Sequence, residues 1–241
     1  MSLSLHGFGP ALAEGAAVTL VVAALSAVLA LGLGAAAAAA ALSRHRGARA
    51  LALTYVSVVR GVPDLLIMLL VFYGGQMLVN RVADAWGRVP PDVDPMVAGV
   101  LTIGTVGGAY VGEVLRGAWL AVPAGAREAA LSLGFTRARL LWRITGPLAW
   151  RHALPGLSNL WLVMLKSTSL VSVIGLSDLM GRAGQAAGAT REPFAFWLAA
   201  AAVYLGFTAV SEAGFAWCRR RWALDDGSGA GGRRPAAERT A

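Results

Sequence analysis

The chain has 241 residues, of which 57% are hydrophobic and 14% are charged, and its formal net charge is +8. A soluble globular domain carries roughly 25% charged residues, so this composition excludes an ordinary soluble protein. The basic residues alternate with apolar segments and do not gather on one aromatic-rich surface, which argues against a nucleic-acid-binding protein. The single cysteine, Cys218, excludes an internal disulfide and a multi-cysteine metal site.

Five segments are long or apolar enough to cross a bilayer, which takes about 20 helical residues. They predict an all-α integral membrane protein with about five transmembrane helices, at 16–42, 62–79, 96–112, 154–176 and 193–218. The first segment has no charged residue and ends in a run of alanines. We therefore expect it to be a peripheral span that frames the bundle.

The distribution of basic residues predicts the orientation of the spans. If the segments after the first, third and fifth spans are cytoplasmic, 15 basic residues lie inside and 4 lie outside. The positive-inside rule then places the N-terminus outside and the C-terminus inside. We expect a periplasmic N-terminus at 1–15 without a cleaved signal peptide, a transmembrane domain at 16–222, and a disordered cytoplasmic tail at 223–241.

The segment 128–147, EAALSLGFTRARLLWRITGP, contains too many arginines for a membrane span. It predicts two short helices separated at Gly134, because glycine most readily takes the left-handed conformation that ends a helix. Thr136 is placed to cap the second helix, which we expect to end at Pro147. An apolar stripe between arginines fits either an interfacial helix on anionic lipid or a hairpin that docks a partner.

Charged residues at the second and third spans predict pairs at the helix ends. Arg60 and Asp64 flank the start of the second span, where an acidic residue is favoured by the helix dipole. Glu113 and Arg116 lie three residues apart on one helix face and can pair as the third span leaves the membrane. The same span carries a small-xxx-small series that predicts close helix packing, formed by Gly104, Gly108 and Gly112.

The fourth span contains the only lysine of the chain, Lys166. A lysine at the bilayer centre costs about 2.5–3.5 kcal/mol on insertion scales. We therefore expect Lys166 to face the bundle interior or a water-filled path, with the hydroxyls of Ser167, Thr168 and Ser169 as partners; snorkelling is the alternative. Asp178 is expected in an outer loop. Near the inner end of the last span, Glu212 is expected to pair with Arg219 or Arg220.

The spacing Glu128-Ala129-Ala130, Gly134, Ile144 and Pro147 resembles the "EAA" loop of permease subunits in binding-protein-dependent ABC importers. The family pattern ends Ile-x-Leu-Pro, and Gly146 replaces the leucine here. In that family the loop is the cytoplasmic element that docks into a groove on the ATPase subunit. The resemblance implies the same coupling role for the matching residues here, within 124–148.

Three further stretches resemble the polar amino acid uptake branch of this family: RGVPDLLIMLLVFY at 60–73, AYVGEVLRG at 109–117 and LKSTSLV at 165–171. The likeness is strongest to the Q-type subunit of histidine/lysine/arginine/ornithine and octopine/nopaline transporters. Ser167 stands where many members have Asp, and the basic-amino-acid subunit is a branch with Ser. The resemblance implies a type I importer permease fold in a bacterial inner membrane. The implied translocation-path residues are Arg60, Asp64, Tyr110, Glu113, Lys166, Ser167, Thr168 and Asp178.

The resemblance also implies partner proteins: a second permease subunit, homologous or identical, two ATPase subunits that use ATP and Mg²⁺, and a periplasmic or lipid-anchored solute-binding protein. The chain itself has no phosphate-binding loop, because its lysine follows Leu165 and not a glycine. No histidine has a metal-ligand or catalytic-triad context. We therefore expect a transporter subunit without a cofactor or enzyme activity of its own. The alternatives are import of another polar solute such as glutamine, or an ATP-independent channel or carrier.

Overall fold

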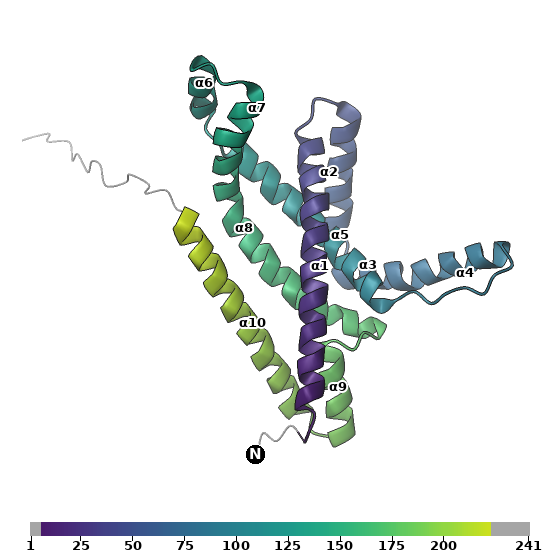
Figure 1. Cartoon of the computed structure of the whole chain (residues 1–241). Helices are drawn as coiled ribbons and strands as arrows, with labels where there is room; N and C mark the ends of the chain where they lie inside the picture. Colours follow the sequence, from purple (N-terminus) through teal and green to yellow (C-terminus); the bar gives the residue numbers. More distant parts are fainter. Residues whose placement is uncertain (1–5, 223–241) are drawn as a thin grey trace, which may run out of the picture.

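The computed structural model of the chain describes residues 6–222. Within this range every regular element is helical, and five segments are long and apolar enough to cross a membrane. They are Gly9–Ala41, Asp64–Ala85, Pro95–Leu120, Arg137–Ile174 and Pro193–Arg220. The hairpin of α6 (Ala124–Ser132) and α7 (Arg137–Leu140) lies at one end of the bundle and the start of α1 (Gly9–Ala41) at the other (Figure 1). The predicted all-α membrane fold with about five spans is confirmed.

The first span, α1 (Gly9–Ala41), begins at Gly9 and not at residue 16, with proline in its first turn. It packs along α5 (Pro95–Leu120), the third span, which is the most buried of the five. One face of α1 is buried along its length, including Thr19, Val22 and Ala30, while Leu25 and Val28 are exposed. The expected peripheral position fits this exposed face, and small residues on both helices let the inner face pack closely on α5.

The glycines of α5 bring its backbone close to α1. A Cβ atom on Gly104 would lie 2.6 Å from Leu29 Cδ2, and one on Gly108 would lie 2.9 Å from Leu33 Cβ. At Gly112 the nearest atom would be Ala37 Cβ, at 3.2 Å. Gly107 faces the opposite neighbour, α8 (Gly146–Ser167), where a Cβ atom would lie 2.5 Å from Met164 Sδ. Because α5 lacks side chains at these positions, it can contact α1 and α8 at the same time.

One further helix, α2 (Arg46–Gly61), lies beside α1 and α5 at the hairpin end (Figure 1). The sequence pattern does not predict it, since arginines at its start interrupt the apolar run. Ala52 and Val56 are buried on its inner face. Tyr55 donates a hydrogen bond to the carbonyl oxygen of Thr105 at 2.6 Å, and this bond ties α2 to α5.

The second span, expected at 62–79, consists of α3 (Asp64–Leu69), a π-helical turn (Leu70–Gly74) and α4 (Gly75–Ala85). Asp64 stands at its first position, as the helix-dipole argument predicts. Figure 1 shows α3 and α4 extending sideways from the bundle. Apolar side chains on this arm, such as Leu78 and Val82, are exposed. The chain alone therefore leaves most of its second span without protein contacts.

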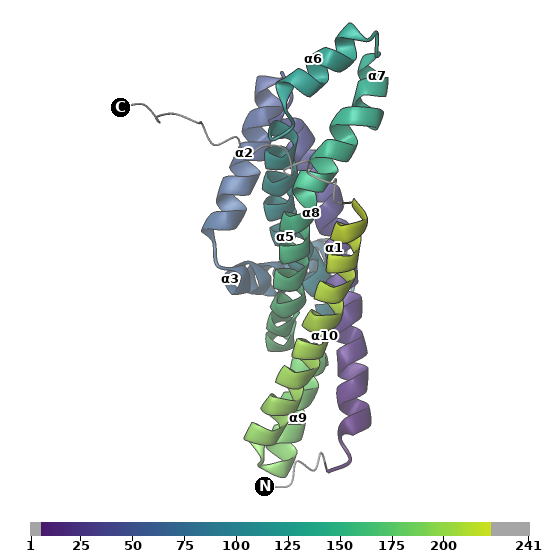
Figure 2. The ribbon, with the colours of Figure 1, turned by 90° about the vertical axis from the view of Figure 1, so that its left-hand side faces the viewer.

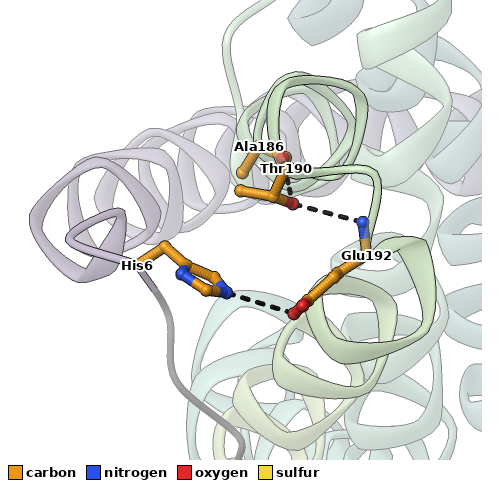
Figure 3. A network of polar contacts seen from close by, with 4 residues as sticks. All are labelled: His6, Ala186, Thr190 and Glu192. Carbon is orange, nitrogen blue, oxygen red and sulfur yellow. Dashed lines mark hydrogen bonds and ion pairs between the residues drawn. The ribbon is translucent and has the colours of Figure 1, made fainter.

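The end of the bundle opposite the hairpin is closed by α1, α9 (Leu179–Thr190) and α10 (Pro193–Trp222) (Figure 2). The helix α9 replaces the outer loop that we expected there. Leu12, Leu179 and Phe196 form a small core between the three helices. In Figure 3, His6 Nε2 lies 3.2 Å from Glu192 Oε2, while the backbone nitrogen of Glu192 donates to Thr190 Oγ1 at 3.3 Å. The segment before α1 is thus attached to the α9–α10 turn.

Substituting Gly108→Leu should destabilise the protein by roughly 1–3 kcal/mol, because the new side chain overpacks the contact with Leu33 and Tyr55. The control is Gly117→Leu on the same helix, where nothing lies within 4 Å of the added Cβ atom. Thermal melting of the purified protein in detergent measures the difference. Equal melting temperatures for the two variants would contradict the close α1–α5 contact.

Candidate functional site

The hairpin at the end of the bundle consists of α6 (Ala124–Ser132) and α7 (Arg137–Leu140), joined at Gly134. The φ angle of Gly134 is +78°, which confirms the predicted left-handed helix end. Thr136 Oγ1 accepts a hydrogen bond from the backbone nitrogen of Arg139 at 3.3 Å, so the predicted helix cap is also confirmed. The helix–glycine–helix geometry follows from local sequence signals alone.

The prediction that the second helix ends at Pro147 is wrong. A π-helical turn, Leu141–Thr145, joins α7 to α8 without a break, and Pro147 falls in the first turn of α8. The backbone nitrogen of Gly146 donates to the carbonyl oxygen of Leu141, five residues earlier, and a Cβ atom on Gly146 would lie 2.7 Å from that oxygen. The wider turn changes the hydrogen-bond register just before the proline, so its missing N–H does not stop the helix.

Arg127 holds the hairpin against the end of α5. Its Nη2 donates to the carbonyl oxygens of Val122 at 2.8 Å and Trp119 at 3.4 Å. Its guanidinium carbon lies 6.0 Å from the centre of the Trp119 ring. Sequence reasoning missed this role, since nothing in the sequence shows which arginine turns back toward the preceding helix.

The surface of the hairpin combines family-matched residues with large, exposed apolar side chains. Among the family-matched positions, Glu128 and Ala129 are exposed, Ala130 is buried, and Ile144 and Pro147 are half-buried. Large apolar side chains beside them are strongly exposed, with Leu133 at 78% and Trp142 at 79%. Ala130 therefore packs the hairpin internally, while the rest of the hairpin presents a mixed charged and apolar surface, with Arg137, Arg139 and Arg143 exposed, of the kind that binds another protein.

Asp64, Tyr110 and Ser167 come from three different helical segments and line one hollow inside the bundle. The free space is about 30 Å³, which holds water but is far too small for an amino acid. Most of the wall is apolar, from residues such as Met68, Ile103 and Met164. Thr102 also lines this hollow, and its buried hydroxyl has no hydrogen-bond partner. Sequence reasoning missed Thr102, because threonine is common on buried helix faces.

Charged residues lie beside Tyr110. The guanidinium carbon of Arg60 is 5.0 Å from the centre of the Tyr110 ring. Arg116 donates to both carboxylate oxygens of Glu113, from Nε at 3.1 Å and from Nη2 at 3.0 Å, which confirms that predicted pair. The predicted Arg60–Asp64 pair is wrong, since the ion pairs of residues 6–222 do not include it. The extended residues Val62 and Pro63 separate α2 from α3, and Arg60 lies over the aromatic ring of Tyr110.

Lys166 and Thr168 lie away from this hollow. Lys166 is exposed and lines a separate depression with Ser169, Trp197 and Tyr204, so the expectation of an interior position is wrong for the single chain. The hydroxyls of Thr168 and Ser169 donate to backbone carbonyl oxygens one turn earlier, each at 2.8 Å, and are not partners of the ammonium group. Local backbone bonding satisfies these hydroxyls within their own turn of helix.

Asp178 lies at the far end of the bundle, outside the membrane-spanning segments, and caps α9. Its Oδ1 accepts from the backbone nitrogen of Gly181 at 2.9 Å, while the buried Oδ2 has no hydrogen-bond partner. Burial raises the pKa of the Asp178 carboxyl, which is 1% exposed. Next to it, Thr19 Oγ1 accepts from the backbone nitrogen of Leu179 at 3.1 Å. These contacts indicate a structural role in joining α9 to α1.

The predicted pairing of Glu212 with Arg219 or Arg220 is wrong as well. Within residues 6–222 the ion pairs are His6–Glu192, Glu113–Arg116 and Glu14–Arg182. Glu212 is exposed on α10. Two long side chains on an exposed helix gain little from pairing, because solvent or headgroups compete for both charges.

Comparison with known proteins places this geometry in a family. Residues 29–223 match the family model described as "Binding-protein-dependent transport system inner membrane component". The histidine/lysine/arginine/ornithine transport system permease protein HisQ of Escherichia coli K12 is 44% identical over 220 residues, which cover 91% of this chain and 96% of HisQ. The nopaline transport system permease protein NocQ of Agrobacterium fabrum is 45% identical over 213 residues, 87% of this chain and 89% of NocQ.

A solved structure agrees with these sequence relatives. A crystal structure of an amino acid ABC transporter with histidines contains a chain with a TM-score of 0.79 and 30% identity. The match covers 91% of the present chain and 97% of that one. The helix arrangement is therefore shared over almost the whole length.

Asp178→Asn should flatten the pH dependence of stability. Because burial raises the native pKa, the stabilisation from Asp178 is fully present below its unfolded pKa and is lost as the pH rises through the native pKa. The asparagine keeps an acceptor for Gly181, so its melting temperature relative to wild type should rise between about pH 4 and about pH 7. Asp178→Ala removes the same carboxyl and also loses the cap, so it should show the same pH trend and be about 1 kcal/mol less stable than Asp178→Asn at both pH values. A constant difference between Asp178→Asn and wild type would contradict the buried carboxyl.

Proposed function

The chain belongs to the family of binding-protein-dependent transport system inner membrane components, and we propose that it is a permease subunit of an ATP-driven importer of cationic amino acids. The observation that carries this proposal is the exposed hairpin around Gly134 on a chain whose sequence has no phosphate-binding loop. Such a chain needs another protein to hydrolyse ATP. It also needs a surface through which that hydrolysis acts on the membrane helices.

We assign that surface to Glu128, Ala129, Ala130, Gly134, Ile144 and Pro147, with exposed Leu133 and Trp142 beside them. Two ATPase subunits, which use ATP and Mg²⁺, would dock there. The π-helical turn makes α7 and α8 one continuous rod, so a displacement of the hairpin is carried directly into the fourth span. Arg127 links the other arm of the hairpin to the end of α5. Motion at the docking surface would therefore reach both helices that line the hollow.

The basic residues support an orientation with the N-terminus outside and the hairpin in the cytoplasm, where ATP is available. Residues 1–15 would then be periplasmic, and the proposed cytoplasmic tail, 223–241, lies outside the described residues. A periplasmic or lipid-anchored solute-binding protein would deliver solute at the end formed by α9 and the start of α1.

The hollow lined by Asp64, Tyr110 and Ser167 is the proposed start of the translocation path, with Arg60 and Glu113 beside it. With a volume of about 30 Å³ the hollow cannot admit a solute molecule, as an importer requires between transport cycles. ATP-driven closure of the ATPases would shift the bundle to a conformation in which this space opens. A carboxylate in an apolar wall favours a cationic side chain, in agreement with the substrates that the names of HisQ and NocQ state.

A second permease subunit, homologous or identical, would complete the path. Two features of the single chain support this. The sideways arm formed by α3 and α4 has few contacts, and Lys166 lies exposed on a membrane-spanning segment. A lysine facing lipid is costly, so contact with a second subunit would stabilise this face.

Gly134→Val should weaken binding of the ATPase subunit, because a β-branched residue resists the left-handed conformation by roughly 1–2 kcal/mol. The control is Gly134→Asn, since asparagine tolerates this conformation and should retain most binding. Pull-down of the ATPase and ATP-dependent uptake measure the effect, with membrane insertion expected to be normal in both variants. Wild-type docking and transport by Gly134→Val would exclude the coupling assignment.

Asp64→Asn should raise the arginine concentration for half-maximal uptake by about tenfold or more, since a bond to a charged partner contributes about 1.5–3 kcal/mol. Asp84→Asn is the control, because Asp84 is an exposed carboxylate on α4 away from the hollow. Uptake of labelled arginine is measured with lysine, ornithine and glutamine as competitors. If glutamine alone competed, the assignment as an importer would stand, and a cationic substrate would be excluded. Uptake that continues after ATP depletion would indicate a carrier.

A further inference from the structure

A groove near the hairpin end of the bundle is separate from the hollow of the proposed path. Its walls are α1 and α8, and its floor is the last two turns of α5. It has a volume of about 490 Å³ and is open to the side of the molecule. Its lining consists of small or apolar residues, namely Ala35, Ala38, Ala39, Leu42, Leu115, Ala118, Trp119, Gly146, Ala149, Trp150 and Ala153.

The sequence explains why the groove stays open. Alanines make up much of both walls, and their small side chains leave space between α1 and α8. The last helix does not cover the groove, because the hairpin end of α10 lies well apart from α1 (Figure 1). An apolar groove of this kind within a membrane-spanning bundle must be filled by a hydrocarbon chain or by another protein.

Arginines lie at the end of the groove that points toward the hairpin. Arg44 and Arg46 follow Leu42 in the connection from α1 to α2, and both are exposed. The guanidinium carbon of Arg127 lies 6.0 Å from the centre of the Trp119 ring, and its Nη2 already donates to the carbonyl oxygens of Trp119 and Val122, so Arg127 adds positive charge near this end. No acidic residue lines the groove. The two lining tryptophans, Trp119 and Trp150, are the residue type that is enriched at the level of lipid headgroups.

We propose that this groove binds one anionic phospholipid, with an acyl chain between α1 and α8 and the phosphate near the exposed Arg44 and Arg46. The apolar lining excludes a free phosphate ion as the occupant, and the arginines favour an anionic over a zwitterionic headgroup. The lipid contacts Gly146 and Trp150, at the start of the helix that continues from the hairpin. It therefore supports the base of that hairpin.

Photolabelling in the complete transporter tests this site. Membranes receive a phosphatidylglycerol with a diazirine on its acyl chain, and mass spectrometry locates the labelled residues. Label should appear on the groove-lining residues of α1 and α8, and unlabelled phosphatidylglycerol should compete at lower concentrations than phosphatidylcholine does. Ala39→Phe should reduce this label at least severalfold by filling the groove. Ala35→Phe, one turn away on the same wall, should do the same.

The matched control is Ala36→Phe, because Ala36 is equally an exposed alanine of α1 but does not line the groove. Its label should equal that of wild type. Replacing Arg44 and Arg46 by glutamine should raise the competing phosphatidylglycerol concentration by roughly ten- to thirtyfold, the effect of two surface cations. Equal competition by phosphatidylcholine would overturn the headgroup assignment. Absence of label in the wild-type groove would show that another subunit fills it and would overturn the proposal. ATPase binding to Gly134→Val tests the coupling role separately.

Discussion

The close approach of α5 to its neighbours is the constraint on which the other features depend. In a bilayer there is no hydrophobic gain from moving one apolar helix against another, so packing at short range must hold the bundle together. Glycines at 104, 108 and 112 let α1 approach on one side, and Gly107 lets α8 approach on the other. The central helix therefore fixes the positions of both helices at the same time.

This arrangement connects the hairpin with the closed hollow inside the bundle. The closed hollow lies between α3, α5 and α8, and the hairpin is attached to α5 through Arg127 and to α8 through the π-helical turn. The proposed docking surface on the hairpin is thus connected to both α5 and α8, which line the hollow. Rigid elements with two possible arrangements are the usual carriers of such coupling. The helix α3 carries Asp64 and packs against α5 through the buried Met68, whereas α4 beyond it has few contacts with the bundle.

Features that depend on neighbouring residues were predictable from the sequence. The five spans follow from hydropathy, the hairpin turn from Gly134, and the Glu113–Arg116 pair from a spacing of three on a helix. Features that depend on tertiary context were not predictable from the sequence. The helix α2 is fixed by contacts with α1 and α5, and the helix continues through Pro147 because a π-helical turn precedes it. The extended residues Val62 and Pro63 separate Asp64 from Arg60, although the two are only four residues apart in the sequence.

Some polar residues of the spans have partners within their own helix, and others have none in this chain. Glu113 and Arg116 pair within one helix, and the hydroxyls near Lys166 bond to their own backbone, so these groups are satisfied before any subunit binds. Lys166 itself and the apolar arm are not, because both lie exposed on the surface of this chain. An exposed charge on a membrane-spanning segment instead indicates which face the assembly covers. Because an unpaired lysine in lipid is costly, contact with a partner subunit stabilises this chain relative to the isolated chain in the membrane.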